Sequence, residues 1–434
     1  MRRWRRVSRC GNCKNKHESG VDRLDIRLYW VWLSLALKAG HPATAMLLRA
    51  FEHPRAVFEA DEKALQQAGV KPELIKRLKE TSLKDAERVV AECEKPDIFL
   101  LTPDDPLYPA RLLNLPDLPP VLYGKGDFRG LPADSPAITV VGPRSVSPAG
   151  AHKIAYLTAG LVAGGATIVS GGAVGGDATA MKTALDCGGE LIVVQACGLD
   201  VNYPTETAAL RERLLSQGGT LFSEYPPGQT VGRGTFFVRN RLLSGLSLGT
   251  LVPEAQARSG TLITAHCARD QGRDVFAVPG DEVLCAGCHN LIREGALLVT
   301  RSTDILSEYL TTHAAFVDLA AAYAAEEEFR ARAPEKDKLE NPLRRLFKKR
   351  SEKPKKKLSS PPQETKTEEI PLPDGATDTA KAVYAVLSAT PKNLDDIADE
   401  TALPPAAVLT ALTELELFGT VQSFAGRQYA KKGR

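Results

Sequence analysis

Residues 167–177 of the chain read TIVSGGAVGGD, a short apolar strand that runs into a glycine-rich turn and then into the start of a helix. The same order occurs at residues 138–147, which read ITVVGPRSVS. Glycine lets backbone N–H groups approach an anion, and the start of a helix adds a partial positive charge. Because ligands of an open parallel sheet gather at the carboxyl ends of its strands, these turns predict one phosphate-binding edge.

Further apolar stretches alternate with helical stretches around these turns. Strands are expected at residues 137–141, 166–170, 190–196, 219–222, 249–252, 273–277 and 296–299. This strand–helix–strand alternation is typical of an α/β fold with a doubly wound, extended Rossmann-like parallel sheet that carries helices on both faces.

The alternation occupies the middle of the chain, and other patterns flank it. We expect a disordered basic extension at 1–22, a helical module at 23–95, the sheet domain at 96–308 and a charged linker at 309–370. Residues 371–434 carry three helical stripes and a short hairpin, which is typical of a winged helix.

Two local features of these regions allow further interpretation. Proline-rich residues 96–135 are expected to connect the helical module to the sheet. Gly69-Val70 lies between two predicted helices, where it fits a helix-hairpin-helix turn that binds a DNA phosphate through backbone N–H groups. A plain turn of a helical bundle fits the same residues, and we favour it.

The composition is that of a soluble globular protein, with 43% apolar and 25% charged residues. No apolar run reaches the roughly 18–20 residues of a membrane span, so we expect a cytoplasmic protein without membrane contact. The net charge is only +3, but residues 1–27 hold nine basic and three acidic residues, and residues 330–357 hold thirteen and four. Such blocks are usually solvated, and some bind polyanions.

Two CxxC pairs, Cys10/Cys13 and Cys285/Cys288, raise the question of a zinc site. They lie far apart in the sequence, and the second lies inside the predicted sheet domain. We therefore expect no metal site and no cofactor, and we interpret the pairs as chance spacings or as a local redox sensitivity.

The sharpest polar cluster is Arg239-Asn240-Arg241, one turn after Phe236. The planar fork of arginine bonds two phosphate oxygens at once, and an aromatic ring can stack on an unpaired base. Arg144 follows the first glycine turn, where helix capping does not explain a cation.

The remaining polar groups of the turns have structural and functional interpretations. Ser147 suits the N-cap of a helix that begins at Pro148. Asp177 would repel a phosphate, so we expect it to organise its loop. Glu224 and Glu254 end strands at the same edge, as a catalytic pair or as salt-bridge partners of the arginines. Because no nucleophile, base and orienting group are spaced together, no catalytic residue is predicted.

The order of these motifs resembles the DprA/Smf family, the DNA-processing proteins of bacterial natural transformation. The resemblance spans about residues 100–300 and is carried by Gly142-Pro143-Arg144, residues 170–177, Ser223-Glu224, residues 236–241, Glu254-Ala255, residues 259–265, Val278-Pro279-Gly280 and residues 289–296. The helical module and the winged helix also look like the family's flanking domains. Pro143, Phe237 and Met181 depart from the family pattern, and Pro143 removes a hydroxyl and a backbone donor from the first turn.

The resemblance implies a dimeric protein that is not an enzyme. Such proteins bind incoming single-stranded DNA, protect it and load the RecA recombinase onto it during natural transformation or homologous recombination. Carried over to this sequence, the expected DNA-binding residues are Gly142, Arg144, Ser147, Ser170, Gly171, Gly172, Phe236, Arg239, Asn240, Arg241, Ser259, Gly260 and Thr261. Binding that neutralises several phosphates should weaken steeply with salt.

Two alternatives remain. A nucleotide-binding or nucleotide-cleaving enzyme of the lysine-decarboxylase-like Rossmann group has similar glycine turns, but its Pro-Gly-Gly-x-Gly-Thr-x-x-Glu segment is missing here. A transcription regulator would read DNA with the helix at about residues 404–418, which holds two Glu and neither Arg nor Lys. We therefore expect the winged helix to contact protein or to use its basic tail, which holds Arg427, Lys431, Lys432 and Arg434.

Overall fold

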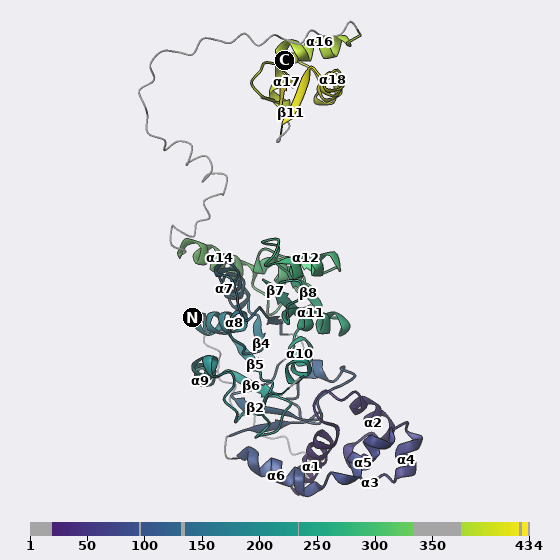
Figure 1. Cartoon of the computed structure of the whole chain (residues 1–434). Helices are drawn as coiled ribbons and strands as arrows, with labels where there is room; N and C mark the ends of the chain where they lie inside the picture. Colours follow the sequence, from purple (N-terminus) through teal and green to yellow (C-terminus); the bar gives the residue numbers. More distant parts are fainter. Residues whose placement is uncertain are drawn as a thin grey trace. The chain divides into compact units, whose positions relative to one another are not determined.

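The structure is a computed structural model that describes residues 20–94, 97–131, 135–232, 234–332, 375–424 and 428–432. The chain divides into two compact units, Met1–Lys338 and Leu339–Arg434, and each is described here by itself (Figure 1). The pair Cys10/Cys13, the predicted basic extension up to residue 19 and the tail residues Arg427 and Arg434 lie outside the described residues. None of the described helices is long and apolar enough to span a membrane.

The first unit begins with a helical module. Its helices are α1 (Gly20–Leu37), α2 (Ala43–Phe51), α3 (Pro54–Glu59), α4 (Glu62–Gln67), α5 (Pro72–Glu80) and α6 (Leu83–Glu94). Trp32 and Leu33 of α1 are fully buried against the other helices, together with Leu47 and Leu65. The same apolar cluster continues into the sheet through Tyr123, so the module and the sheet share one core.

The turn at Gly69 is an ordinary helix end. Gly69 has a positive φ of 81°, and the N–H of Val70 donates to the carbonyl of Leu65 at 3.0 Å. This bond, together with that from the Gly69 N–H to Gln66, satisfies the donors of the turn in the manner of a Schellman motif. The plain-turn interpretation agrees with this arrangement, in which the N–H groups of Gly69 and Val70 are both bonded to carbonyls of the preceding helix.

Within the described residues, the first unit holds a nine-stranded sheet in the order β1-β2-β6-β5-β4-β3-β7-β8-β9. The strands are β1 (Phe99–Leu101), β2 (Leu122–Gly126), β3 (Ala137–Val140), β4 (Thr167–Ser170), β5 (Leu191–Val194), β6 (Thr220–Ser223), β7 (Gly249–Val252), β8 (Asp274–Ala277) and β9 (Leu297–Leu298). Strands β3 to β9 pair in parallel, and β3 has β4 on one side and β7 on the other. This confirms the predicted doubly wound sheet and places its switch point at β3.

Residues 96–135 are more than the connection that the sequence predicts. They contain β1 and β2, which pair with each other in antiparallel fashion, and β2 also pairs antiparallel with β6. These strands are short and lie among prolines, so the sequence shows no clear period-two pattern there.

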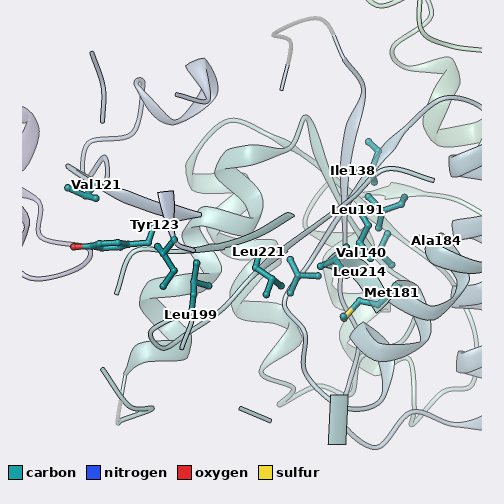
Figure 2. Packing of buried hydrophobic residues seen from close by; sticks show 14 of the residues in the cluster. Val121, Tyr123, Ile138, Val140, Met181, Ala184, Leu191, Leu199, Leu214 and Leu221 are labelled. Atoms are coloured by element: carbon teal, nitrogen blue, oxygen red, sulfur yellow. The ribbon is translucent and has the colours of Figure 1, made fainter. Parts of the chain in front are cut away.

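The helices that follow the strands are α7 (Pro148–Ala163), α8 (Gly176–Asp186), α9 (Ala208–Ser216), α10 (Thr235–Leu246), α11 (Thr261–Asp270), α12 (Ala286–Arg293), α13 (Ser302–Ser307) and α14 (Leu319–Arg332). Successive residues of a strand point to opposite faces. On β3, Ile138 and Val140 therefore join the apolar cluster that contains Met181 of α8, while Ala137 joins the cluster that contains Leu243 of α10. Figure 2 shows the first of these clusters, with Ile138, Val140 and Met181 close together.

The second unit has the predicted winged-helix form. Its elements are α16 (Asp378–Val386), β10 (Lys392–Asn393), α17 (Leu394–Thr401), α18 (Pro405–Leu417), β11 (Val421–Phe424) and β12 (Gln428–Lys431). The strands form a small sheet in the order β10-β12-β11, so β10 adds an edge to the predicted hairpin. Val383, Ile397 and Leu412, one from each helix, are fully buried in the core of this unit.

Candidate nucleic-acid interface

The first glycine turn leads from β3 into α7, and its helix start already holds a carboxylate. Ser147 is the N-cap of α7, and its hydroxyl accepts the N–H of Gly150 at 2.9 Å. The carboxylate of Glu254, which follows β7, accepts the N–H of Ser147 at 2.9 Å and also its hydroxyl. Because Glu254 occupies the positive end of α7, that helix start cannot also receive a phosphate.

The second glycine turn leads from β4 into α8, and Asp177 organises it as expected. This buried carboxylate accepts the backbone N–H groups of Gly142 at 3.3 Å and of Ala173 at 3.4 Å. Burial raises the pKa of Asp177, while Arg239 and these N–H groups act against the rise. A Cβ added at Gly176 would lie 2.4 Å from the Cα of Gly142, so the two turns touch through their backbones.

Arg239 of α10 is buried and bonds to the ends of two strands. Its guanidinium is buried, and one nitrogen donates to the carbonyls of Gly171 and Val194, the latter at 2.7 Å. Burial lowers the pKa of this guanidinium, and Asp177 opposes that shift. Arg239 therefore fixes the ends of β4 and β5.

Arg241 lies only two residues farther along α10 but has a different environment. Its side chain is buried and forms an ion pair with Glu224 at 2.5 Å and a second with Asp117 at 3.2 Å. Glu224 also accepts the backbone N–H of Gly40 from the helical module at 3.1 Å. Burial raises the pKa of Glu224, and Arg241 lowers it.

The two strand-end carboxylates bond to different partners. Glu224 is the salt-bridge partner of Arg241, as one interpretation expected, whereas Glu254 bonds to the N–H and hydroxyl of Ser147.

A cavity of about 440 Å³ opens at the carboxyl ends of β3 and β7, between the first glycine turn, α10 and the start of α11. We call it the strand-end cavity. It is lined by Val141, Gly142, Pro143, Arg144, Ala173, Asp177, Phe236, Phe237, Arg239, Asn240, Leu243, Ser259, Gly260, Thr261, Ile263 and Thr264. Phe237 is 60% exposed at this cavity, so its ring is accessible to a ligand there.

Arg144 supplies the exposed positive charge of the strand-end cavity. Its guanidinium lies 5.1 Å from the ring centre of Phe236, within the range of a cation–π contact. In the described part of the chain, no carboxylate forms an ion pair with it. Arg144 is therefore exposed and available to an anion, whereas Arg239 is buried and bonded to carbonyls and Arg241 is buried and ion-paired.

The start of α11 lies at the same cavity and is not blocked. Its N-cap is Gly260, which has no side chain to cap the helix, and the N–H of Thr261 donates to the hydroxyl of Ser259 at 3.2 Å. A Cβ added at Gly260 would meet no atom within 4 Å, so this position is open. Among the described residues, no acidic side chain accepts from this first turn, in contrast to the N-cap Ser147 of α7, which bonds to Glu254. The N–H groups of Leu262 and Ile263 donate to the carbonyls of Ser259 and Gly260.

The structure brings most of the predicted binding residues together and separates a few from them. Those at the strand-end cavity are Gly142, Arg144, Phe236, Arg239, Asn240, Ser259, Gly260 and Thr261. Ser147, Ser170, Gly172 and Arg241 do not line it, and Gly171 lines a neighbouring hollow instead. The hydroxyl of Ser170 is buried and donates to the carbonyl of Val140 at 2.9 Å, so it supports the sheet.

Sequence reasoning missed Tyr203, which is 36% exposed beside Phe236 with ring centres 6.0 Å apart. It also missed Asp117 and Gly40 as partners of the Arg241 network. For Tyr203, the only signal in the sequence was its position directly before a proline. Nothing in the sequence indicated Asp117 or Gly40 as partners of Arg241.

The pair Cys285/Cys288 is buried, and both thiols are free. Burial raises the pKa of Cys288 to about 12, which disfavours the thiolate that binds a metal or reacts with an oxidant. No group of three or more metal-ligating side chains occurs within the described residues.

Comparison with known proteins adds independent information. A family model described as DNA recombination-mediator protein A matches residues 99–310, and a DprA winged helix domain model matches residues 364–427. The Smf protein of Synechocystis sp. is 34% identical over 336 residues, which cover 76% of this chain and 80% of that protein. The DNA processing protein DprA of Streptococcus pneumoniae is 42% identical over 207 residues, or 47% of this chain and 72% of that one.

Structural comparison agrees with the sequence matches. The X-ray structure of DNA processing protein A from Streptococcus pneumoniae superposes with a TM-score of 0.54 at 33% sequence identity. The superposition covers 64% of this chain and 97% of that one.

Proposed function

Because the chain belongs to the DNA recombination-mediator protein A family, we propose that it binds single-stranded DNA at the strand-end cavity and, as a homodimer, loads the RecA recombinase onto that strand. It acts in the cytoplasm by binding and protecting DNA during natural transformation or homologous recombination, without a catalytic step. The observation that carries this proposal is Arg144, an exposed guanidinium that lies over an aromatic ring and shares one cavity with a helix start that no described carboxylate occupies.

The proposed contact has a definite chemistry. A backbone phosphate lies between Arg144 and the first turn of α11, where it receives charge-assisted hydrogen bonds and the positive end of the helix dipole. A base next to that phosphate stacks on Phe236 or Phe237, a contact that tolerates any base. The start of α7 takes no part, because Glu254 already bonds to its N-cap Ser147, and the carboxylate of Asp177 in the first turn of α8 would repel a phosphate there.

The buried arginines have a supporting role in this proposal. Arg239 fixes the ends of β4 and β5, and Arg241 pairs with Glu224, the carboxylate that accepts the N–H of Gly40 from the helical module. The carried-over role of Arg241 as a direct phosphate contact is therefore replaced by a positioning role.

Fluorescence anisotropy of a labelled single-stranded oligonucleotide over a salt series tests DNA binding. We expect tight binding whose affinity falls steeply with salt, and an unlabelled single strand that competes better than a duplex. Absence of binding at low salt would contradict the proposal. A screen for cleavage of nucleoside monophosphates would then test the lysine-decarboxylase-like alternative.

RecA loading and dimerisation need separate measurements. Single strands coated with single-strand-binding protein should support faster RecA filament formation in the presence of this protein than in its absence. Light scattering after size-exclusion chromatography should give twice the mass of the 46.8 kDa chain. A monomer that binds DNA but leaves RecA assembly unchanged would restrict the function to protection of the strand.

A further inference from the structure

Helix α12 begins with a CxxC pair that the proposed function leaves unused. Cys285 is the N-cap of this eight-residue helix, and Cys288 is the third residue of its first turn. An N-cap side chain turns back over the third helical residue, as it does in a capping box. The thiol of Cys288 accordingly lies within hydrogen-bonding reach of that of Cys285. Cα atoms three residues apart on a helical turn are about 5 Å apart, which is within the span of a disulfide.

A cation and a glycine lie beside this pair of buried, free thiols. The ammonium Nζ of Lys153 donates to the carbonyl of Pro279 at 2.9 Å. A Cβ added at Gly280 would lie 2.6 Å from this Nζ and 2.6 Å from the Sγ of Cys285, so the ammonium and the sulfur are neighbours. Gly280 is exposed and has no side chain, so the sulfur of Cys285 lies close to solvent.

The two thiols differ in how readily they ionise. Burial raises the pKa of Cys285, and the ammonium of Lys153 acts against this rise. The pKa of Cys288 is raised to about 12, mainly by burial, so this thiol stays protonated at neutral pH. Because the thiolate is the form that attacks an oxidant, Cys285 reacts first and Cys288 closes the disulfide.

The start of α12 is fastened to the segment that follows β7. The N–H of Gly287 donates to the carbonyl of Ala255 at 2.8 Å, and the thiol of Cys288 donates to the carbonyl of Val252 at 3.5 Å. The same segment continues to Ser259, which lines the strand-end cavity. A change in the bonding of Cys288 therefore acts on the segment that forms one wall of that cavity.

We propose that Cys285 and Cys288 form a reversible disulfide and that its formation weakens DNA binding at the strand-end cavity. The disulfide removes the thiol proton of Cys288 and with it the bond to Val252. The effect on DNA rests on the proposed function, whereas the formation of the disulfide does not.

Hydrogen peroxide is an oxidant of sufficient power and small size for this step. The Cys285 thiolate attacks one peroxide oxygen, a sulfenic acid forms, and the hydroxide that leaves takes up the proton that Cys285 released. The sulfur of Cys288 then attacks the sulfur of Cys285, and its proton leaves with the hydroxyl group as water. Two thiols are thereby oxidised to one disulfide, and the peroxide is reduced to two molecules of water.

Peptide mapping tests the disulfide directly. Trypsin cleaves after Arg273 and Arg293 and releases residues 274–293, a peptide that holds both thiols and no third. After mild peroxide treatment of the native full chain and labelling of free thiols in denaturant, we expect this peptide to lack two hydrogens and to carry no label. Dithiothreitol should restore two labelled thiols. A peptide that stays reduced, or that is oxidised only to sulfinic acid, would overturn the proposal.

Lys153→Gln tests the assignment of Cys285 as the attacking thiol. Glutamine keeps an N–H donor for the carbonyl of Pro279 but carries no charge, so the thiolate of Cys285 loses its cation. We expect the disulfide in peptide 274–293 to form more slowly than in the wild type at pH 7. An unchanged rate would contradict this assignment.

Anisotropy with a labelled single strand measures the coupling to DNA. Loss of about one net hydrogen bond at the segment after β7 predicts a dissociation constant about two- to tenfold higher for the oxidised chain, and dithiothreitol should reverse it. Cys288→Ser keeps a donor for Val252 and should bind DNA like the reduced wild type with or without peroxide. Cys187→Ser, which removes an exposed cysteine at the end of α8, is the matched control and should respond to peroxide as the wild type does.

The two measurements separate this inference from the proposed function. If the reduced chain binds no DNA, the proposed function fails and the coupling fails with it. If the reduced chain binds DNA and the disulfide forms without a change in affinity, the proposed function stands and the redox control is wrong. A Cys288→Ser variant that still loses affinity in peroxide would also overturn the proposal, because the effect would then come from another residue.

Discussion

The carboxyl edge of the central sheet and the winged helix both have the outline of a nucleic-acid reader, but their charges differ. At the sheet edge, the exposed Arg144 lies beside Phe236 and the open start of α11. Helix α18, which would be the recognition helix, has no Arg or Lys and carries Glu414 and Glu416. Since cations supply much of the affinity for a nucleic-acid backbone, the charges on an element indicate its ligand better than its shape does.

The same difference recurs on a smaller scale within the sheet edge. Arg144 is exposed, whereas Arg239 and Arg241 are buried and bonded to carbonyls or carboxylates. Only the first adds to the positive surface that a strand meets. The following predictions test this division of roles, from the largest expected effect to the smallest.

The largest effect is expected when Arg241 is replaced by methionine. The substitution leaves Glu224 buried without its cation, which should lower the free energy of unfolding by about 3–5 kcal/mol. Urea unfolding followed by circular dichroism measures this. The double variant Arg241→Met/Glu224→Leu, which removes both charges, should recover part of the loss. A single variant as stable as the wild type would show that Arg241 is not a structural cation.

Arg144→Ala should have the opposite profile, with stability retained and DNA affinity lost. Loss of a charged hydrogen bond worth about 1.5–3 kcal/mol predicts a dissociation constant about 10- to 100-fold higher. Anisotropy measures the change. Arg129→Ala is the matched control, because Arg129 is also exposed but pairs with Asp127 on the loop after β2. Equal losses in the two variants would mean that binding is diffuse rather than centred on the cavity.

Removal of the winged helix should change DNA affinity little. A chain that ends at residue 370 keeps the basic linker and loses the unit in which α18 lies. We expect its dissociation constant to stay within about twofold of the full chain, since no cation of α18 is lost. A much larger loss of DNA affinity would contradict the contrast between the sheet edge and the winged helix. It would assign the winged helix a direct DNA contact through residues outside α18.

The smallest effect concerns the stability of the winged helix itself. The hydroxyl and the N–H of Thr377 bond to Glu414, and both lower the pKa of this carboxylate from the ordinary 4.5. When folding lowers the pKa of a carboxyl group, its ionised form stabilises the folded state at pH values above the pKa of the unfolded chain. This stabilisation is lost as the pH falls through the pKa of the folded state. Glu414→Gln should therefore lower the melting temperature of this unit slightly at pH 7 and have no effect at pH 3, as measured by calorimetry. An equal decrease at both values would contradict this explanation.

The sequence predicted the parallel part of the fold well, and the reasons are local. Strands β3, β4 and β7 are apolar runs that end at glycine or proline turns, so their positions follow from composition alone. The antiparallel strands β1 and β2 are short, and they join the sheet through the pairing of β2 with β6, a long-range contact that no local pattern reveals.

The site was predicted in part for a similar reason. Arg144, Phe236 and Ser259 follow strands of one parallel sheet, so the rule for strand ends brings them together. The strand-end rule did not show that Arg239 and Arg241 have different environments. The two arginines lie two residues apart on a helix, which corresponds to a rotation of about 200° around the helix axis. Their side chains therefore leave nearly opposite faces of the helix and could not both face one ligand. The partners of Arg241 come from Asp117 and Gly40, which are remote in sequence.

The bond from Gly40 to Glu224 has a consequence for how the protein comes apart. The helical module and the sheet domain share an apolar core and a hydrogen bond from Gly40 to the buried, ion-paired Glu224, so they should melt in a single cooperative transition. The winged helix, with a core of its own, should melt independently. A fragment cut near residue 96 would expose the Glu224–Arg241 pair to water. The boundary near residue 96 that the sequence composition suggests is therefore unsuitable for separating the two parts.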